Sequence, residues 1–161
     1  MRGVGRHTVR SLELRIPPPA VGLVVAAGMW MVAQLPPILQ VPTRVRLVAA
    51  AVLIAMGIAV AMGGVMSFRR AKTTVNPLKP ETSAALVSTG VYSFTRNPMY
   101  LGMVLALLAW AVYLSSIWSL GGPVLFALYI TRFQIVPEER VLDRLFGANF
   151  AEYKKRARRW L

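Results

Sequence analysis

The sequence contains no cysteine and a single histidine, His7. The absence of cysteine excludes disulfide bonds, thiolate nucleophiles and Cys-ligated metal sites. One histidine near the N-terminus cannot form a multi-histidine metal site or a histidine proton relay. Acidic residues are also few, six Asp and Glu against 19 Lys and Arg. We therefore expect any chemistry in this chain to use few proton carriers and no metal.

Charge is missing altogether from three long stretches, residues 16–43, 47–68 and 97–131. The hydrophobic fraction of 56% exceeds the roughly 45–50% that is usual in soluble domains. A net charge of +13 alone would suit a nucleic-acid-binding protein. Combined with long charge-free runs it favours a membrane protein, because Lys and Arg gather at the cytoplasmic ends of membrane spans. The sequence predicts an integral membrane protein without a nucleic-acid partner.

The third charge-free run has 35 residues. As one helix it would be roughly 50 Å long, too long for a single crossing of about 30 Å. Ser115, Ser116 and the Gly121–Gly122–Pro123 sequence offer turn chemistry near its middle. We therefore expect one all-α domain, 1–161, that forms an integral membrane helical bundle of about four transmembrane helices. The predicted spans are 17–37, 46–68, 98–114 and 118–134.

The distribution of Lys and Arg predicts the orientation of these spans. The N-terminal segment, the loop 69–97 and the tail from residue 132 together carry 17 cationic residues, and only Arg44 and Arg46 fall on the other side. This asymmetry places both termini in the cytoplasm and the chain in the inner, cytoplasmic membrane. A signal peptide is the alternative for the first span, but its apolar run is long and no clear small-x-small cleavage site follows.

The tail, residues 135–161, is amphipathic and predicts two short C-terminal interfacial helices. Two apolar stripes lie before and after Gly147, which is a plausible helix stop. The basic cluster from Lys154 to Arg159 would face lipid headgroups. We expect this cluster to be a membrane anchor rather than part of a catalytic site.

Two places combine polar side chains with a helix start at membrane depth. Asn97 suits an N-cap and Pro98 the first helical position, so this helix start beside Arg96 would favour an anion such as a carboxylate. Tyr100 lies three residues after Asn97, near the same face. The alternative interpretation is a well-capped span with a snorkelling arginine and an interfacial tyrosine.

The second place is the segment 132–139, which ends in Pro137, Glu138 and Glu139. Proline followed by acids is also a standard helix N-terminus. The four-span topology, however, returns this segment to the same side as Asn97. A carboxylate and an anion-attracting helix start would then meet there, as needed to hold a zwitterionic amino acid by both ends.

Residues 74–160 resemble the isoprenylcysteine carboxyl methyltransferase and phospholipid methyltransferase families of integral membrane enzymes. The order and spacing of several short motifs carry the resemblance. These motifs are Lys79–Pro80, LVSTGVY at 86–92, RNPMYLG at 96–102, Glu138–Glu139, FGANFAEY at 146–153 and Arg159–Trp160.

The resemblance implies methyl transfer from S-adenosylmethionine to a small or lipophilic acceptor, a carboxylate, thiol or amine, at the cytoplasmic membrane interface. It implies a set of cofactor-binding residues: Leu86, Val87, Tyr92, Arg96, Asn97, Pro98, Met99, Tyr100 and Glu138. The candidate catalytic residues are Arg132 and Glu139, the latter as the base that an amine acceptor would need. Gln134 is the candidate substrate-binding residue.

The chain departs from the family pattern at two of these positions. Asn97 stands where the family often has histidine, and an amide can donate a hydrogen bond to a carboxylate but cannot gain charge. Gln134 stands where eukaryotic prenylcysteine enzymes have a substrate-binding arginine, with Arg132 two residues earlier. The alternatives are a phospholipid or amine N-methyltransferase of the same fold and a non-catalytic membrane subunit. Cofactor binding would distinguish the subunit from the enzymes.

Overall fold

The computed structural model describes residues 13–37, 39–70 and 86–161, and this part of the chain is helical. Its one β-bridge joins Thr95 to Arg158. The predicted all-α fold is therefore confirmed. Lys79–Pro80 and the basic residues of positions 1–12 lie outside the described residues.

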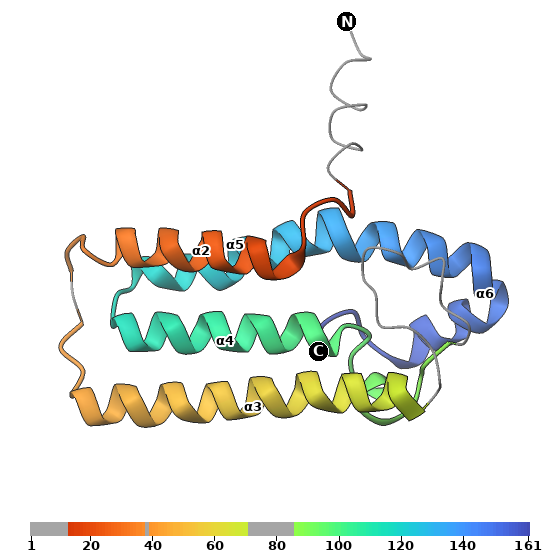
Figure 1. The fold of residues 1–161 in the computed structure, drawn as a ribbon, viewed down its shortest axis with the longest axis horizontal. Helices are drawn as coiled ribbons and strands as arrows, with labels where there is room; N and C mark the ends of the chain where they lie inside the picture. Colours follow the sequence, from red (N-terminus) through yellow and green to blue (C-terminus); the bar gives the residue numbers. More distant parts are fainter. Residues whose placement is uncertain (1–12, 38, 71–85) are drawn as a thin grey trace, which may run out of the picture.

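Four apolar helices form the body of the molecule: α2 (Pro18–Val32), α3 (Thr43–Arg70), α4 (Pro98–Leu114) and α5 (Gly121–Ile130). Helix α4 lies between α3 and the pair formed by α2 and α5 (Figure 1). The main described core, which includes Met29, Leu107 and Phe126, fills the space between α2, α4 and α5. Helix α6 (Val136–Arg156) extends beyond one end of this body, and the C-terminus returns to the start of α4 (Figure 1).

Among the described residues, two helices are long and apolar enough to cross a membrane: α3, with 28 residues, and the continuous helical stretch Trp118–Arg156, with 39. Helices α2 and α4 are apolar but have only 15 and 17 residues, fewer than the ~20 of a typical span. Residues 97–131 do not form one helix. Helix α4 ends at Leu114, Ser115 adopts a left-handed conformation, and the 3-10 turn η3 (Trp118–Leu120) leads into α5.

The tail differs from the sequence prediction, because no break separates the fourth apolar helix from the tail. Helix α5 continues through a π-helical turn, η4 (Thr131–Ile135), directly into α6. Pro137 near the start of α6 has no N–H for the carbonyl four residues earlier, and a wide turn accommodates such a residue without ending the helix. The bend occurs instead at Gly147, whose φ of 48° and ψ of −119° are non-helical.

Helices α3 and α4 approach each other through small residues. A Cβ atom added to Gly102 would lie 2.7 Å from the carbonyl oxygen of Gly57 and 2.9 Å from Cβ of Ala61. One added to Gly64 would lie 2.9 Å from Cγ of Pro98. Small residues at such a crossing let two backbones come close. This contact fixes the start of α4, and with it the position of Tyr100.

Replacing Gly102 by valine is expected to lower the free energy of unfolding by about 1–3 kcal/mol, because the added methyl groups must push α3 away from α4. Unfolding in detergent, followed by tryptophan fluorescence, measures the effect. The control is Gly28→Val on α2, where an added Cβ would meet nothing within 4 Å. Equal stability of the two variants would contradict the close-packing argument.

Candidate functional site

A tyrosine–carboxyl pair joins the first turns of α4 and α6. The hydroxyl of Tyr100 donates a hydrogen bond of 2.6 Å to Oε1 of Glu138. Burial raises the pKa of Glu138 to about 8; the Tyr100 hydrogen bond opposes this shift, and the neighbouring Glu139 carboxylate adds to it. Within the described residues no Lys or Arg forms an ion pair with Glu138. A largely buried carboxyl group without a cationic partner is suited to bind the cationic part of a ligand.

Glu139, the next residue, is fully engaged with arginines. Its Oε1 accepts from Arg96 at 2.8 Å and from Nε of Arg159 at 3.1 Å, and its Oε2 accepts from Arg159 at 2.6 Å. Burial alone would raise the pKa of Glu139, but the two guanidiniums outweigh it and hold this pKa below the usual value. Such a carboxylate is a weak proton acceptor near neutral pH. The geometry therefore disfavours Glu139 as a general base.

Arg96 ties the C-terminal segment to this cluster. Its side chain donates to the carbonyl oxygens of Ala157 at 2.7 Å and Lys154 at 3.3 Å. Its backbone N–H donates to the carbonyl oxygen of Arg158 at 2.8 Å. Arg159 was expected to face lipid headgroups with the rest of the basic cluster, but its guanidinium instead contacts Glu139. Spacing could not have revealed this contact, since the two residues are separated by the bend at Gly147.

Asn97 occupies the N-cap position of α4, but its side chain makes no capping hydrogen bond. Its Nδ2 donates instead to the carbonyl oxygen of Arg159 at 2.8 Å. The predicted capping role of Asn97 was therefore wrong, because its side-chain amide donates to the C-terminal segment instead. Asn97 still lies within the same cluster as Arg96 and Glu139.

A second described core supports the site from the side of α6. The 3-10 turn η2 (Gly90–Ser93) carries Tyr92, whose ring contacts Phe68 of α3 edge-on at 5.3 Å. Tyr153 of α6 donates a 2.7 Å hydrogen bond to the Tyr92 carbonyl. Burial raises the pKa of Tyr92, so its phenol stays neutral. Further predicted site residues lie in or beside this region: Leu86 and Val87 in the core, and Pro98 and Met99 against Gly64 of α3.

The other two candidate residues lie in the π-helical turn. Arg132 does not turn toward Glu138; its side chain is 47% exposed and donates to Glu13 at 3.0 Å. Gln134 is fully buried, and its Nε2 donates to the Ile16 carbonyl at 2.8 Å. Its Oε1 has no hydrogen-bond partner among the described residues. Glu13 was not anticipated from the sequence, because no local pattern pairs residues 119 positions apart.

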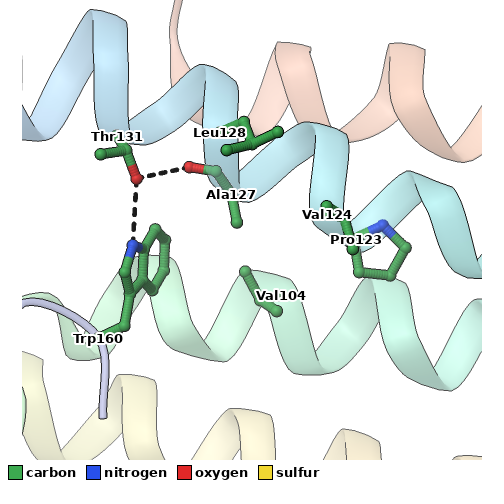
Figure 2. A pocket seen from close by; sticks show the side chains of 7 residues that line it. All are labelled: Val104, Pro123, Val124, Ala127, Leu128, Thr131 and Trp160. Atoms are coloured by element: carbon green, nitrogen blue, oxygen red, sulfur yellow. Dashed lines mark hydrogen bonds between the residues drawn. The ribbon is translucent and has the colours of Figure 1, made fainter.

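An open apolar groove of about 280 Å³ lies between α4 and α5 (Figure 2). At one end the indole N–H of Trp160 donates to Oγ1 of Thr131 at 3.1 Å, and this hydroxyl donates to the Ala127 carbonyl at 2.6 Å. Because Trp160 follows Arg159, the groove and the Glu139 cluster share the C-terminal segment. The remaining lining residues are apolar: Val104, Pro123, Val124 and Leu128.

Comparison with known proteins places this geometry in a family context. The family model described as phospholipid methyltransferase matches residues 45–149. An uncharacterized protein of Haemophilus influenzae is 43% identical over 63 residues, 39% of this chain and all of that protein. Protein-S-isoprenylcysteine O-methyltransferase of Saccharomyces cerevisiae is 36% identical over 81 residues, 48% of this chain and 33% of the yeast enzyme. No solved structure gives a significant match.

Proposed function

Because this chain belongs to the phospholipid methyltransferase family, we propose that it transfers a methyl group from S-adenosylmethionine to a lipophilic or small acceptor at the cytoplasmic membrane interface. The observation that carries the proposal is the Tyr100–Glu138 pair, a largely buried carboxyl group without an ion-pair partner in the described residues. Both residues lie within the family match. We also propose four spans with both termini in the cytoplasm, from the distribution of Lys and Arg.

The residues at the site fit the amino-acid end of S-adenosylmethionine. Glu138 uses one oxygen for the Tyr100 hydroxyl, and a carboxylate has further lone pairs with which to accept an α-ammonium group. Asn97 spends one amide hydrogen on Arg159 and keeps a second with which to reach a carboxylate. The neutral phenol rings of Tyr92 and Tyr100 offer faces for the cationic donor.

The acceptor is constrained by the state of Glu139. When bound, S-adenosylmethionine supplies a methyl group attached to a sulfonium sulfur, and this sulfur is a good leaving group because it departs as a neutral thioether. The protein then has mainly to position the acceptor and the donor. Glu139 is held ionised by Arg96 and Arg159, so it is poorly placed to remove a proton from an ammonium acceptor. This pairing favours an acceptor that is already an anion, a carboxylate or thiolate, over an amine.

The groove between α4 and α5 supports a lipophilic acceptor. Its lining is almost entirely apolar, and the α5 side chains around it, including Val124 and Leu128, are exposed. In a membrane these exposed side chains would contact lipid, so an apolar chain could enter from the bilayer. The groove ends at Thr131 and Trp160 (Figure 2). Trp160 directly follows Arg159, which contacts Glu139.

The test is calorimetric titration of the detergent-purified protein with S-adenosylhomocysteine. Saturable one-site binding is expected, followed by transfer of a labelled methyl group to an acceptor that carries both an apolar chain and a carboxylate or thiol. Absence of binding by protein shown to be folded would favour the non-catalytic membrane subunit. Transfer to amine headgroups alone would favour the phospholipid N-methyltransferase.

Filling the groove is expected to separate acceptor binding from cofactor binding. Ala127→Phe places a ring in the groove, so KM for a lipophilic acceptor should rise about tenfold or more, while the Kd for S-adenosylhomocysteine stays within about twofold. Leu125→Phe is the matched control, because Leu125 lies on the same helix, is exposed and does not line the groove. Equal KM values for the two variants would place the acceptor elsewhere.

A further inference from the structure

The short N-terminal segment 13–16 makes four contacts with the helical stretch that carries Glu138. Glu13 accepts hydrogen bonds from Arg132 at 3.0 Å and from Arg140 at 2.9 Å. The backbone N–H of Leu14 donates to the Phe133 carbonyl at 3.1 Å, and the Ile16 carbonyl accepts from Gln134 at 2.8 Å. This segment lies outside residues 45–149, so the family match assigns it no role.

The Leu14 contact compensates for a defect that Pro137 creates. Proline has no N–H, so the carbonyl four residues earlier, that of Phe133, loses its regular helical donor. A carbonyl buried without a donor costs free energy. The N–H of Leu14 reaches this carbonyl from a different part of the chain. The N-terminal segment thus supplies what the helix lacks at the turn before Glu138.

The Glu13 contacts fix how α6 is rotated. Arg132 and Arg140 lie eight residues apart, about 80° around the axis of a regular α-helix. A π-helical turn winds less per residue, and the turn at 131–135 brings the two arginines closer to one face. One carboxylate oxygen can then accept from both. If the extra residue of the turn were lost, the two arginines would diverge and the residues after them would rotate about the axis.

We propose that residues 13–16 are a positioning element of the cofactor site, in which Glu13 holds the first turns of α6 at the rotation that directs Glu138 to Tyr100. Glu13 is well suited to this task because its side chain is only 13% exposed, which limits screening by water. Burial alone would raise the pKa of Glu13, but Arg140 and Arg132 outweigh it and hold this pKa below the usual value. The ion pairs of Glu13 with Arg132 and Arg140 therefore persist throughout the neutral pH range. The inference rests on the proposed role of Glu138 in cofactor binding.

The first measurement compares two ligands on Glu13→Gln. S-adenosylhomocysteine carries the amino group assigned to Glu138, and 5′-methylthioadenosine lacks the amino-acid part. The Kd of the first is expected to rise about fivefold, the upper range for partly exposed ion pairs, and that of the second less than about twofold. General loss of structure would weaken both ligands alike, and that result would overturn the inference.

The second measurement needs no cofactor. Hydrogen–deuterium exchange of the apo protein should become faster at residues 131–139 in Glu13→Gln and stay unchanged in α4. Glu13→Arg combined with Arg140→Glu restores an ion pair between positions 13 and 140 but sets the arginine at position 13 against Arg132, so exchange and affinity should recover in part. The matched control, Glu152→Gln, removes an exposed ion pair with Arg156 from the same helix and should alter neither.

Unchanged exchange in Glu13→Gln, or no recovery in the charge-swapped variant, would overturn the positioning role. A different pattern separates this inference from the proposed function. If exchange responds to Glu13 as expected while the wild-type protein binds neither nucleoside, the segment does position α6 and the methyltransferase assignment fails.

Discussion

Glu138→Gln is expected to weaken S-adenosylhomocysteine binding at least tenfold and, at the same time, to stabilise the apo protein. The substitution removes a charge-assisted hydrogen bond to the ligand ammonium worth roughly 1.5–3 kcal/mol. The amide oxygen of glutamine can still accept from the Tyr100 hydroxyl. Stability rises because folding of the wild type buries an ionisable group, which glutamine does not carry.

The pH dependence follows from the same carboxyl group. Below its unfolded pKa of about 4.5, Glu138 is protonated in both states and carries no penalty. Between 4.5 and about 8 the unfolded chain releases this proton while the folded protein keeps it, so the contribution of Glu138 to stability falls as pH rises. The fall is at most about 1.4 kcal/mol for each pH unit. Above pH 8 it levels off.

Ligand affinity should change in the opposite direction over this window, because a ligand ammonium binds the ionised form of Glu138. Calorimetry between pH 5.5 and 8 measures how ligand affinity changes with pH, and thermal unfolding of the same sample measures how stability changes with pH. Both slopes should be reduced in Glu138→Gln and preserved in Glu152→Gln, which alters an exposed carboxylate of the same helix. A folded Glu138→Gln protein with wild-type affinity would show that another group holds the amino end.

Arg96→Ala is expected to give the largest loss of stability, roughly 3 kcal/mol, because it leaves a largely buried carboxylate short of a partner. The side chains of Arg96 and Glu139 are only 11% and 14% exposed. The substitution also removes the donors to Ala157 and Lys154, which hold the C-terminal segment in place. Because that segment contacts Asn97 and Thr131, the affinity for the cofactor should fall and KM for the acceptor should rise.

Thermal unfolding followed by tryptophan fluorescence measures this effect, with Arg158→Ala as the matched control. Arg158 is exposed and contributes its backbone carbonyl rather than its side chain to the cluster, so its loss should cost less than about 0.5 kcal/mol. Arg96→Lys should be intermediate, since an ammonium cannot reproduce the planar fork of a guanidinium. Indistinguishable unfolding of Arg96→Ala and Arg158→Ala would show that the buried pair contributes little.

Several features of the fold were accessible from the sequence because they depend on local properties. The absence of charge over three long runs indicated apolar helices, and these runs do contain the helices α2, α3, α4 and α5. Ser115 and Ser116 marked the break after α4, whereas Gly121, Gly122 and Pro123, also expected as turn residues, form the first turn of α5. Pro98 marked a helix start and Gly147 a bend. Of the family motifs, those from Lys79 to Glu139 lie within the family match, the FGANFAEY motif at 146–153 extends past its end, and Arg159–Trp160 lies outside it.

The sequence was misleading where a local signal competed with a distant partner. Asn97 has the chemistry of an N-cap, yet its amide bonds to Arg159, 62 residues away. Pro137 suggested a break between two helices, yet the π-helical turn and the N–H of Leu14 let the helix continue. Arg159 resembled any other member of a basic cluster until the bend at Gly147 brought it back to Glu139.

By itself, then, the sequence determined the helical class, the apolar runs and the residue types available for chemistry, because composition and spacing along the chain set them. The tertiary structure decided which of two adjacent carboxyl groups pairs with arginines among the described residues. Glu138 and Glu139 are identical in kind and consecutive in the chain, but successive helix positions differ by about 100° around the axis. One therefore meets Tyr100 and the other meets two arginines, and only the packing of α4, α6 and the C-terminal segment assigns these partners.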